Sequence, residues 1–293
     1  MRLGLTNLAW APDQDEAVAR LMQQQGIDAV DVAPSKYFEE PLRATGQAIA
    51  AVRRWWADRG IEITGMQSLL FNTEPGLNLF GAAPVRQRML ERLTAVCRIA
   101  AGLGAPRLVF GSWRNRDRRG LMDAEADAIA LDFFGQLAER AAAEGVWICL
   151  EGVAPHYGAN YLTDTASTLA LARQLDHPAI RVQLDTVTIR EAGEDIDALL
   201  AAHAGLIGHV HVCERDLLPI GDGDMPHDWM AAAIRRHLPD HVVCLEMLTP
   251  AGEAPASALT RAILVARQHY VRHAARSRSE SPALARRGFR GDE

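Results

Sequence analysis

The chain has 293 residues, of which 48% are hydrophobic and 23% are charged, and its formal net charge is −6. This composition is typical of a globular protein whose core needs no disulfides, and the negative charge argues against a large nucleic-acid-binding surface. No apolar run approaches the ~18 residues of a membrane span. The N-terminus also lacks a basic segment followed by a long apolar stretch, so we expect a cytoplasmic protein with no signal peptide.

The first half of the chain alternates short β-like runs with longer amphipathic stretches. Strands are expected at 3–8, 27–32, 61–70 and 107–110, and helices at 15–25, 41–59 and 84–103. Gly26, Gly60 and Gly104 follow these three helices directly, as glycine commonly does at a helix C-terminus.

The second half repeats this alternation. Helices are expected at 123–144, 163–175, 196–204, 226–237 and 256–273, and strands at 147–151, 180–185, 207–212 and 242–247. Eight alternating strand–helix units imply parallel strands joined by right-handed crossovers. No GxGxxG or P-loop motif follows the first strand, which disfavours an open doubly wound sheet. The sequence therefore predicts an α/β fold, a single (β/α)8 TIM barrel over residues 1–272.

The C-terminal residues 273–293 differ from the rest in composition. They are rich in Arg, Ser and Gly and show no apolar periodicity. We expect them to form a flexible, disordered tail.

Four consecutive strands of the second half each carry, at or near their carboxyl end, a side chain that can bind a metal. These residues are Glu151, Asp185, His211 and Glu246. The carboxyl ends of barrel strands meet at one rim, and burying several unpaired carboxylates there would cost too much free energy. One divalent metal ion would compensate them. Three carboxylates and one imidazole suit Mn²⁺, Mg²⁺ or Co²⁺, with Zn²⁺ possible.

The segments around these residues resemble the sugar phosphate isomerase/epimerase superfamily, the xylose isomerase-like TIM barrels. They read CLEG at Glu151, VQLDT at Asp185, GHVHVCE at His211 and CLEM at Glu246, and the resemblance covers about residues 1 to 270. It implies that these four residues bind one divalent metal. It also implies that Glu151 and Glu246 flank the substrate carbon that loses and regains a proton.

This chemistry predicts a metal-dependent isomerase or epimerase acting on a small-molecule sugar, keto-sugar or sugar derivative through a metal-bound enediol. One glutamate would remove the proton and the other would return it, to the opposite face in an epimerase or to the neighbouring carbon in an aldose–ketose isomerase. Candidate substrate-binding residues lie near the rim. They are Trp10, Gln67, Arg114, Arg116, His156, His209, Glu214 and Arg215.

Several of these candidates also have ordinary structural explanations. Trp10 could pack in the core, and His209 could be a hydrogen-bonded core residue rather than one that orients a metal ligand. The arginines could clamp hydroxyls or a phosphate through their forked donors, or belong to a solvated loop. Many related ketose epimerases have a histidine three residues after the strand-six aspartate, where this chain has Thr188.

Three other functions remain open at this stage. A metal-dependent lyase or dehydratase acting on an inosose or keto-glycoside would use the same residues. An endonuclease IV-like hydrolase would need more histidine ligands and a basic surface than this chain offers. The last alternative is a binding protein without catalytic activity. Relatives are often homo-oligomers, but the residues of this chain do not determine its oligomeric state.

Overall fold

The computed structural model describes residues 1–271, and the tail predicted at 273–293 lies outside these residues. Eight parallel strands form a closed barrel in chain order, as predicted. They are β1 (Arg2–Thr6), β2 (Ala29–Val32), β3 (Glu62–Met66), β4 (Arg107–Phe110), β5 (Trp147–Glu151), β6 (Ile180–Asp185), β7 (Ile207–Val212) and β8 (Val242–Leu245). The barrel closes where β1 pairs with β8, with Leu3 opposite Val243.

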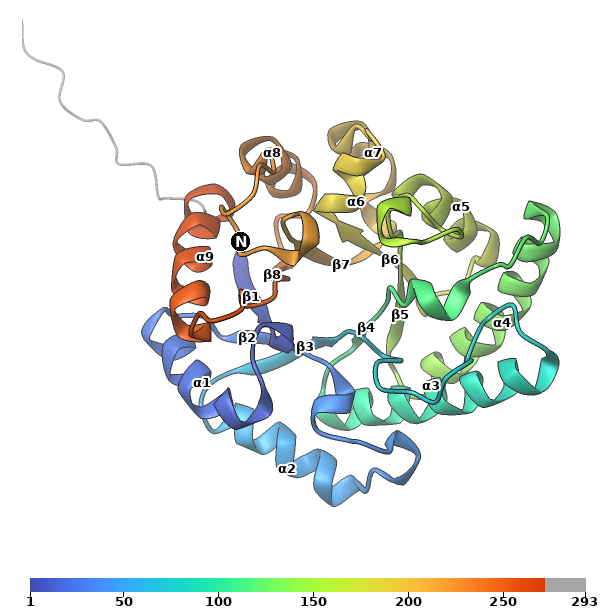
Figure 1. The fold of residues 1–293 in the computed structure, drawn as a ribbon, viewed down its shortest axis with the longest axis horizontal. Coiled ribbons are helices and arrows are strands. Elements are labelled where there is room, and N and C mark those ends of the chain that lie inside the picture. Colours follow the sequence, from blue (N-terminus) through green and yellow to red (C-terminus); the bar gives the residue numbers. More distant parts are fainter. Residues whose placement is uncertain (272–293) are drawn as a thin grey trace, which may run out of the picture.

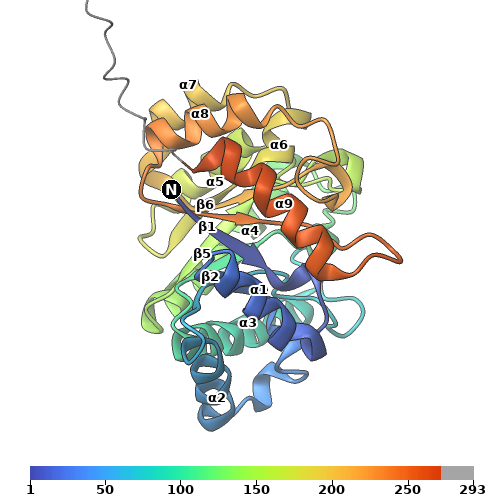
Figure 2. The ribbon, with the colours of Figure 1, turned by 90° about the vertical axis from the view of Figure 1, so that its left-hand side faces the viewer.

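Helices surround the strands and follow one another around the barrel in chain order (Figure 1). They are α1 (Asp15–Gln24), α2 (Gly46–Ala57), α3 (Ala83–Leu103), α4 (Asp123–Ala143), α5 (Thr165–Leu175), α6 (Thr186–Glu191), α7 (Ile196–His203), α8 (His227–His237) and α9 (Pro255–Tyr270). At the closure, α9 packs beside α1 (Figure 2). None of the helices within residues 1–271 is both long and apolar enough to cross a membrane.

The strands alternate between two environments, which explains how the barrel can be apolar outside and polar inside. In β7, Val210 and Val212 belong to the main apolar core, while His209 and His211 lie between them in sequence. Successive side chains on a strand point to opposite faces. The valines therefore pack toward the helices, and the histidines face the barrel interior.

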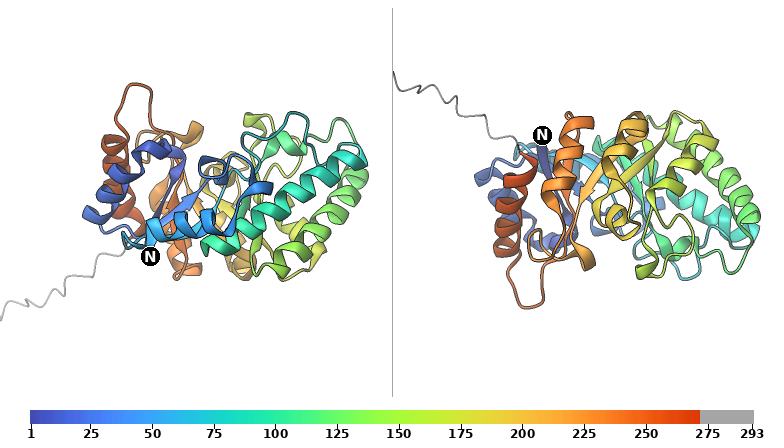
Figure 3. Two further views of the ribbon diagram at one scale, coloured as in Figure 1. Left: turned by 90° about the horizontal axis from the view of Figure 1, so that it is seen from below. Right: turned by 90° about the horizontal axis from the view of Figure 1, so that it is seen from above.

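The two ends of the barrel differ in what they carry. Figure 3 shows the N-terminus at one end and the loop between β8 and α9 protruding from the other. Because every strand runs in the same direction, all the strand carboxyl ends lie at this second end. Residues that end a strand therefore gather on one rim, as a functional site in this fold requires.

Several predicted boundaries were wrong, and one helix was missed. The third strand was expected to continue to residue 70 but ends at Met66, because Ser68 adopts a left-handed backbone with φ 53° that starts a turn. The eighth strand ends at Leu245 rather than at residue 247. The short helix α6 was not expected. It follows β6 directly because the carboxylate of Asp185 accepts a hydrogen bond from the backbone N–H of Thr188 and caps the helix.

Candidate metal centre

The four predicted metal ligands come together in two overlapping groups at the carboxyl rim. The ligand atoms of Glu151, His211 and Glu246 lie within 4.8 Å of one another, and so do those of Asp185, Cys213 and Glu246. The barrel register accounts for this convergence, since Asp185 pairs with His211 across β6 and β7. Glu246 belongs to both groups. The sequence did not single out Cys213 as a member.

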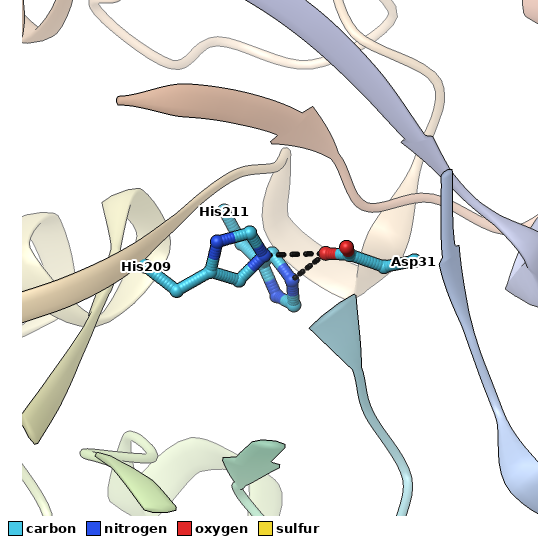
Figure 4. A group of neighbouring side chains, drawn as sticks. All are labelled: Asp31, His209 and His211. Atoms are coloured by element: carbon cyan, nitrogen blue, oxygen red, sulfur yellow. Dashed lines mark hydrogen bonds and ion pairs between the residues drawn. The ribbon is translucent and has the colours of Figure 1, made fainter. Parts of the chain in front are cut away.

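The two ring nitrogens of His211 have different neighbours. Its Nδ1 lies 3.4 Å from Oε2 of Glu246, and its Nε2 lies 3.3 Å from Oδ2 of Asp31. His209 forms a hydrogen bond to the same oxygen of Asp31, so both rings converge on one carboxylate (Figure 4). A histidine that binds a metal commonly donates its other N–H to a carboxylate, which fixes the ring. Nδ1 is therefore the nitrogen of His211 available to a cation.

Asp31 is a member of this cluster that the sequence analysis missed. It lies in β2, is fully buried, and contacts histidines about 180 positions later in the chain. One local signal could have drawn attention to it. An acidic residue inside the apolar strand AVDV needs a buried partner, because an unpaired buried charge is costly.

The charges of this inner cluster are set by mutual contact. Burial alone would raise the pKa of Asp31, but the imidazoles of His209 and His211 hold it well below its usual range. Burial lowers the pKa of His209. For His211, burial also acts to lower the pKa, but the carboxylates of Glu246 and Asp31 outweigh it and raise the pKa well above the ordinary value. The lowered pKa favours the ionised form of Asp31, which His211 can use as an acceptor.

The outer carboxylates crowd one another. Burial raises the pKa of Glu151 well above its usual value, and the nearby charges of Glu246 and Asp185 raise it further. Burial and the charge of Glu246 likewise raise the pKa of Asp185. A divalent cation would relieve this repulsion, and carboxylate oxygens with one imidazole suit Mn²⁺, Co²⁺, Mg²⁺ or Zn²⁺. The donor set fits such an ion.

The backbone beneath Glu151 leaves room for its carboxylate. A Cβ atom added to Gly111 would lie 1.7 Å from Oε2 of Glu151, so any other residue at this position would displace the carboxylate. Asp185 is held by hydrogen bonds. Its Oδ1 accepts from the Thr188 N–H at 2.7 Å, and its Oδ2 accepts from Sγ of Cys213 at 2.9 Å. The Asp185 side chain is therefore positioned without an ion.

Two of the predicted substrate-binding residues line a cavity next to this cluster. The cavity has a volume of about 720 Å³, and its lining includes Gln67 and Arg114 together with Glu151 and Glu246. Arg116 lies behind Glu151, fully buried, with its guanidinium directed at the backbone carbonyls of Phe110 and Leu162. Burial lowers the pKa of Arg116 to about 10, although the charge of Glu151 opposes this shift.

His156 and Arg215 connect two rim loops. Nη2 of Arg215 lies 2.8 Å from Nδ1 of His156, and Nε2 of His156 lies 3.2 Å from Oδ1 of Asp216. The backbone N–H of Asp216 also donates to the hydroxyl of Tyr157 at 2.9 Å. These contacts fasten the loop after β5 to the loop after β7. A substrate contact by His156 or Arg215 stays a prediction.

Three other candidates are engaged inside the fold. The indole N–H of Trp10 donates to Asp15 at 2.7 Å, and His209 lies on Asp31 as described above. The carboxylate of Glu214 accepts the backbone N–H groups of Gly221 and Met225 and bonds the His227 ring at 2.9 Å. It thereby holds the loop that leads to α8. The hydroxyl of Thr188, similarly, donates to the carbonyl of Gly152 at 2.8 Å.

Comparison with known proteins agrees with this architecture. The family model described as xylose isomerase-like TIM barrel matches residues 19–268. Among solved structures, D-psicose 3-epimerase in the presence of D-fructose superposes with a TM-score of 0.76 at 18% identity, covering 92% of this chain and 99% of that one. The 3-keto-D-glucoside 4-epimerase from E. coli gives 0.76 at 17%, covering 92% and 99%. The IolI protein with a bound zinc atom gives 0.72 at 14%, covering 93% and 100%. At these identities, the likeness is one of fold.

Proposed function

The chain belongs to the xylose isomerase-like TIM barrel family, and from this premise we propose that it is a divalent-metal-dependent isomerase or epimerase of a sugar or sugar derivative. The observation that carries the proposal is the position of two glutamates. Glu151 and Glu246 approach each other around His211, and both border the same cavity. Such a pair can serve the two proton transfers that either reaction needs.

Glu151, Asp185, His211 and Glu246 would hold the cation. When bound, a divalent cation would acidify a substrate C–H bond by polarising the neighbouring carbonyl. Mn²⁺ is the foremost candidate for this site. Asp31 would keep His211 in the orientation that presents Nδ1, and Gly111 would leave the space that the Glu151 carboxylate occupies.

In this proposal, each glutamate transfers one proton. One carboxylate takes up the proton from the carbon next to the carbonyl and becomes a carboxylic acid. The other, already protonated from solvent, donates its own proton to the opposite face or to the neighbouring carbon and becomes a carboxylate. The amide of Gln67 and the guanidinium of Arg114 line the cavity and would bind substrate oxygens.

A lyase or dehydratase remains the second candidate. It would begin with the same proton removal and end with loss of a leaving group instead of proton return. Thr188 gives a reason to keep it. Many related ketose epimerases carry a histidine at this position, whereas here the Thr188 hydroxyl is bound to the Gly152 carbonyl. Analysis of products separates the two, because elimination releases water or an aglycone.

The test measures solvent-proton exchange. D-fructose and D-psicose are incubated in D₂O with the Mn²⁺-loaded protein, and deuterium at the carbon next to the carbonyl is followed by NMR. We expect Glu151→Gln and Glu246→Gln each to lower exchange roughly 10²–10⁴-fold. Glu62→Gln is a matched control, because Glu62 begins β3 at the other end of the barrel, where it pairs with Arg2. Near-normal exchange in both glutamine variants would contradict the proposal.

Metal content gives an independent measurement. Elemental mass spectrometry of the wild-type protein should find about one equivalent of a divalent metal, and His211→Ala should lose it. A wild-type protein that binds no metal, even when the ion is added, would contradict the metal site itself.

A further inference from the structure

The cavity next to the two glutamates is larger than a free monosaccharide needs. Its volume of about 720 Å³ lies in the upper part of the range of about 300–1,000 Å³ found for sites that bury drug-sized ligands. Glu151, Glu246 and Gln67 form one part of its lining. Most of the remainder is contributed by the loops that follow β1, β3, β4 and β7. This remainder is where the shape and chemistry of the substrate beyond its reacting carbon would be recognised.

Apolar side chains from four different loops line this cavity. Leu8 follows β1, Phe71 follows β3, Trp113 follows β4 and Leu217 follows β7. The side chain of Phe71 is the most open of them, since the residue is 59% exposed. A single exposed apolar residue would need no explanation, but several that converge on one cavity form a surface suited to an apolar ligand group.

The loops that present Phe71 and Leu217 adopt unfavourable backbone conformations. Ser68 and Asn72 have φ values of 53° and 56° on either side of Phe71, and Leu217 itself has φ 56°. Non-glycine residues in this left-handed region cost free energy, and they cluster where a site must hold a defined shape. Hydrogen bonds fix both loops. The Phe71 N–H donates to the Ser68 carbonyl at 3.0 Å, and the Leu217 carbonyl accepts from the Leu248 N–H at 2.8 Å.

Gln67 shows that the cavity is also built for a polar group. Gln67 is only 1% exposed, and neither its Oε1 nor its Nε2 has a hydrogen-bond partner within residues 1–271. Leaving a buried amide unpaired is costly, and a ligand that offers both a donor and an acceptor would satisfy it. Sugar hydroxyls have both properties. The unpaired amide of Gln67 therefore calls for a polar ligand group beside the glutamates, next to the turn that carries Phe71.

The charges in the cavity lining argue against a phosphate group. The lining carries two arginines, Arg114 and Arg119, and four carboxylates, Glu74, Asp117, Glu151 and Glu246. A phosphate site concentrates positive charge or backbone N–H groups, whereas this lining has more acidic than basic side chains. An uncharged substituent fits the lining better.

We infer that the substrate is a sugar bearing an uncharged apolar ring, such as the aglycone of a keto-glycoside. The sugar would lie at Gln67 and the two glutamates, and the apolar ring would lie against Phe71, Trp113 and Leu217. This inference rests on the proposed function, because it takes Glu151 and Glu246 as the groups that face the reacting carbon. It adds a substrate class, namely a substituted sugar rather than a free or phosphorylated one.

The experiment compares three probes by isothermal titration calorimetry on the full chain loaded with Mn²⁺. These are D-glucose, phenyl β-D-glucopyranoside and D-glucose 6-phosphate. Burying an apolar ring is worth roughly tenfold or more in affinity, so the phenyl glucoside should bind at least about tenfold more tightly than glucose. Phe71→Ala should remove most of this difference while leaving the affinity for glucose unchanged. Leu264→Ala is the matched control, because Leu264 is 52% exposed on α9, outside the cavity lining.

Three results would overturn the inference. The first is equal affinity for glucose and the phenyl glucoside, which includes the case in which neither binds detectably. The second is tighter binding of glucose 6-phosphate than of the other two probes. The third is a preference for the phenyl glucoside that survives Phe71→Ala. These results are distinguishable from failure of the proposed function. Glutamate-dependent proton exchange without a preference for the phenyl glucoside would overturn only the substrate class. A clear preference in a protein that exchanges no proton on a phenyl keto-glucoside, nor on the free ketoses, would overturn only the reaction.

Discussion

Replacing Gly111 by alanine tests whether the cation site depends on the position of one carboxylate. The new Cβ atom would lie 1.7 Å from Oε2 and 2.9 Å from Cδ of Glu151. Non-bonded carbon and oxygen atoms do not approach this closely, so the carboxylate must move by about 1 Å or more. The backbone of Gly111 has no positive φ that would itself exclude alanine. The perturbation therefore acts on the Glu151 side chain.

The expected magnitudes follow from this displacement. Because the clashing atoms are the far end of a movable side chain, we expect the free energy of unfolding to change by less than about 1 kcal/mol. A misplacement of this size in a reacting group costs roughly 100-fold in rate, and disturbing a ligand's support costs about 10–100-fold in metal affinity. Gly111→Ala should therefore remain folded while losing cation affinity and proton exchange.

The assay combines calorimetric titration with Mn²⁺, urea unfolding and deuterium exchange. Gly135→Ala is the matched control, since Gly135 lies within α4 and an added Cβ would meet nothing within 4 Å. It should stabilise the protein by about 0.5–1 kcal/mol, because glycine is unfavourable inside a helix, and leave cation binding unchanged. Wild-type cation affinity and exchange in Gly111→Ala would refute the assigned role of Glu151.

Two further predictions concern charge. Asp31→Asn should lower Mn²⁺ affinity about 10–100-fold in calorimetric titration, because His211 loses its carboxylate acceptor. Asp28→Asn is the control, since Asp28 forms an exposed ion pair with Arg2, and it should leave the Mn²⁺ affinity unchanged. Equal Mn²⁺ affinities of the two variants would contradict the role of Asp31. In the cation-free protein, the raised pKa of Glu151 gives a contribution to stability that is fully present below the unfolded pKa of about 4.3 and is lost as pH rises through the folded pKa. Urea unfolding with EDTA or with Mn²⁺ should therefore show a stabilisation by the metal that grows over this pH range, and a pH-independent difference would count against the prediction.

The rim of the barrel was the part of the molecule that was easiest to predict from the sequence. Parallel strands bring their carboxyl ends to one place, so the residues that end β5 and β6 and the one that follows β8 could be expected together from chain order alone. The position of Asp31 could not be predicted from chain order. Its contacts with His209 and His211 run across the barrel interior, and no local pattern relates residues so far apart in sequence.

For other parts of the chain, local backbone conformation and hydrogen bonds limited what could be predicted from the sequence. The apolar segment after Met66 suggested that β3 continues, but the left-handed conformations of Ser68 and Asn72 turn it into a loop. The residues of α6 are rich in β-branched side chains and do not suggest a helix. They form one because Asp185 caps it. Glu214, expected near the substrate, holds its own loop through hydrogen bonds that only the folded chain defines.

The contact between β2 and β7 has a consequence for splitting the barrel into fragments. A cut between β4 and β5 would leave all four candidate ligands on the C-terminal fragment, because Glu151 is the first of them in sequence. Asp31, however, would remain on the N-terminal fragment. The affinity of the C-terminal half for a cation would then depend on docking of the other half, so cation binding could report fragment complementation directly.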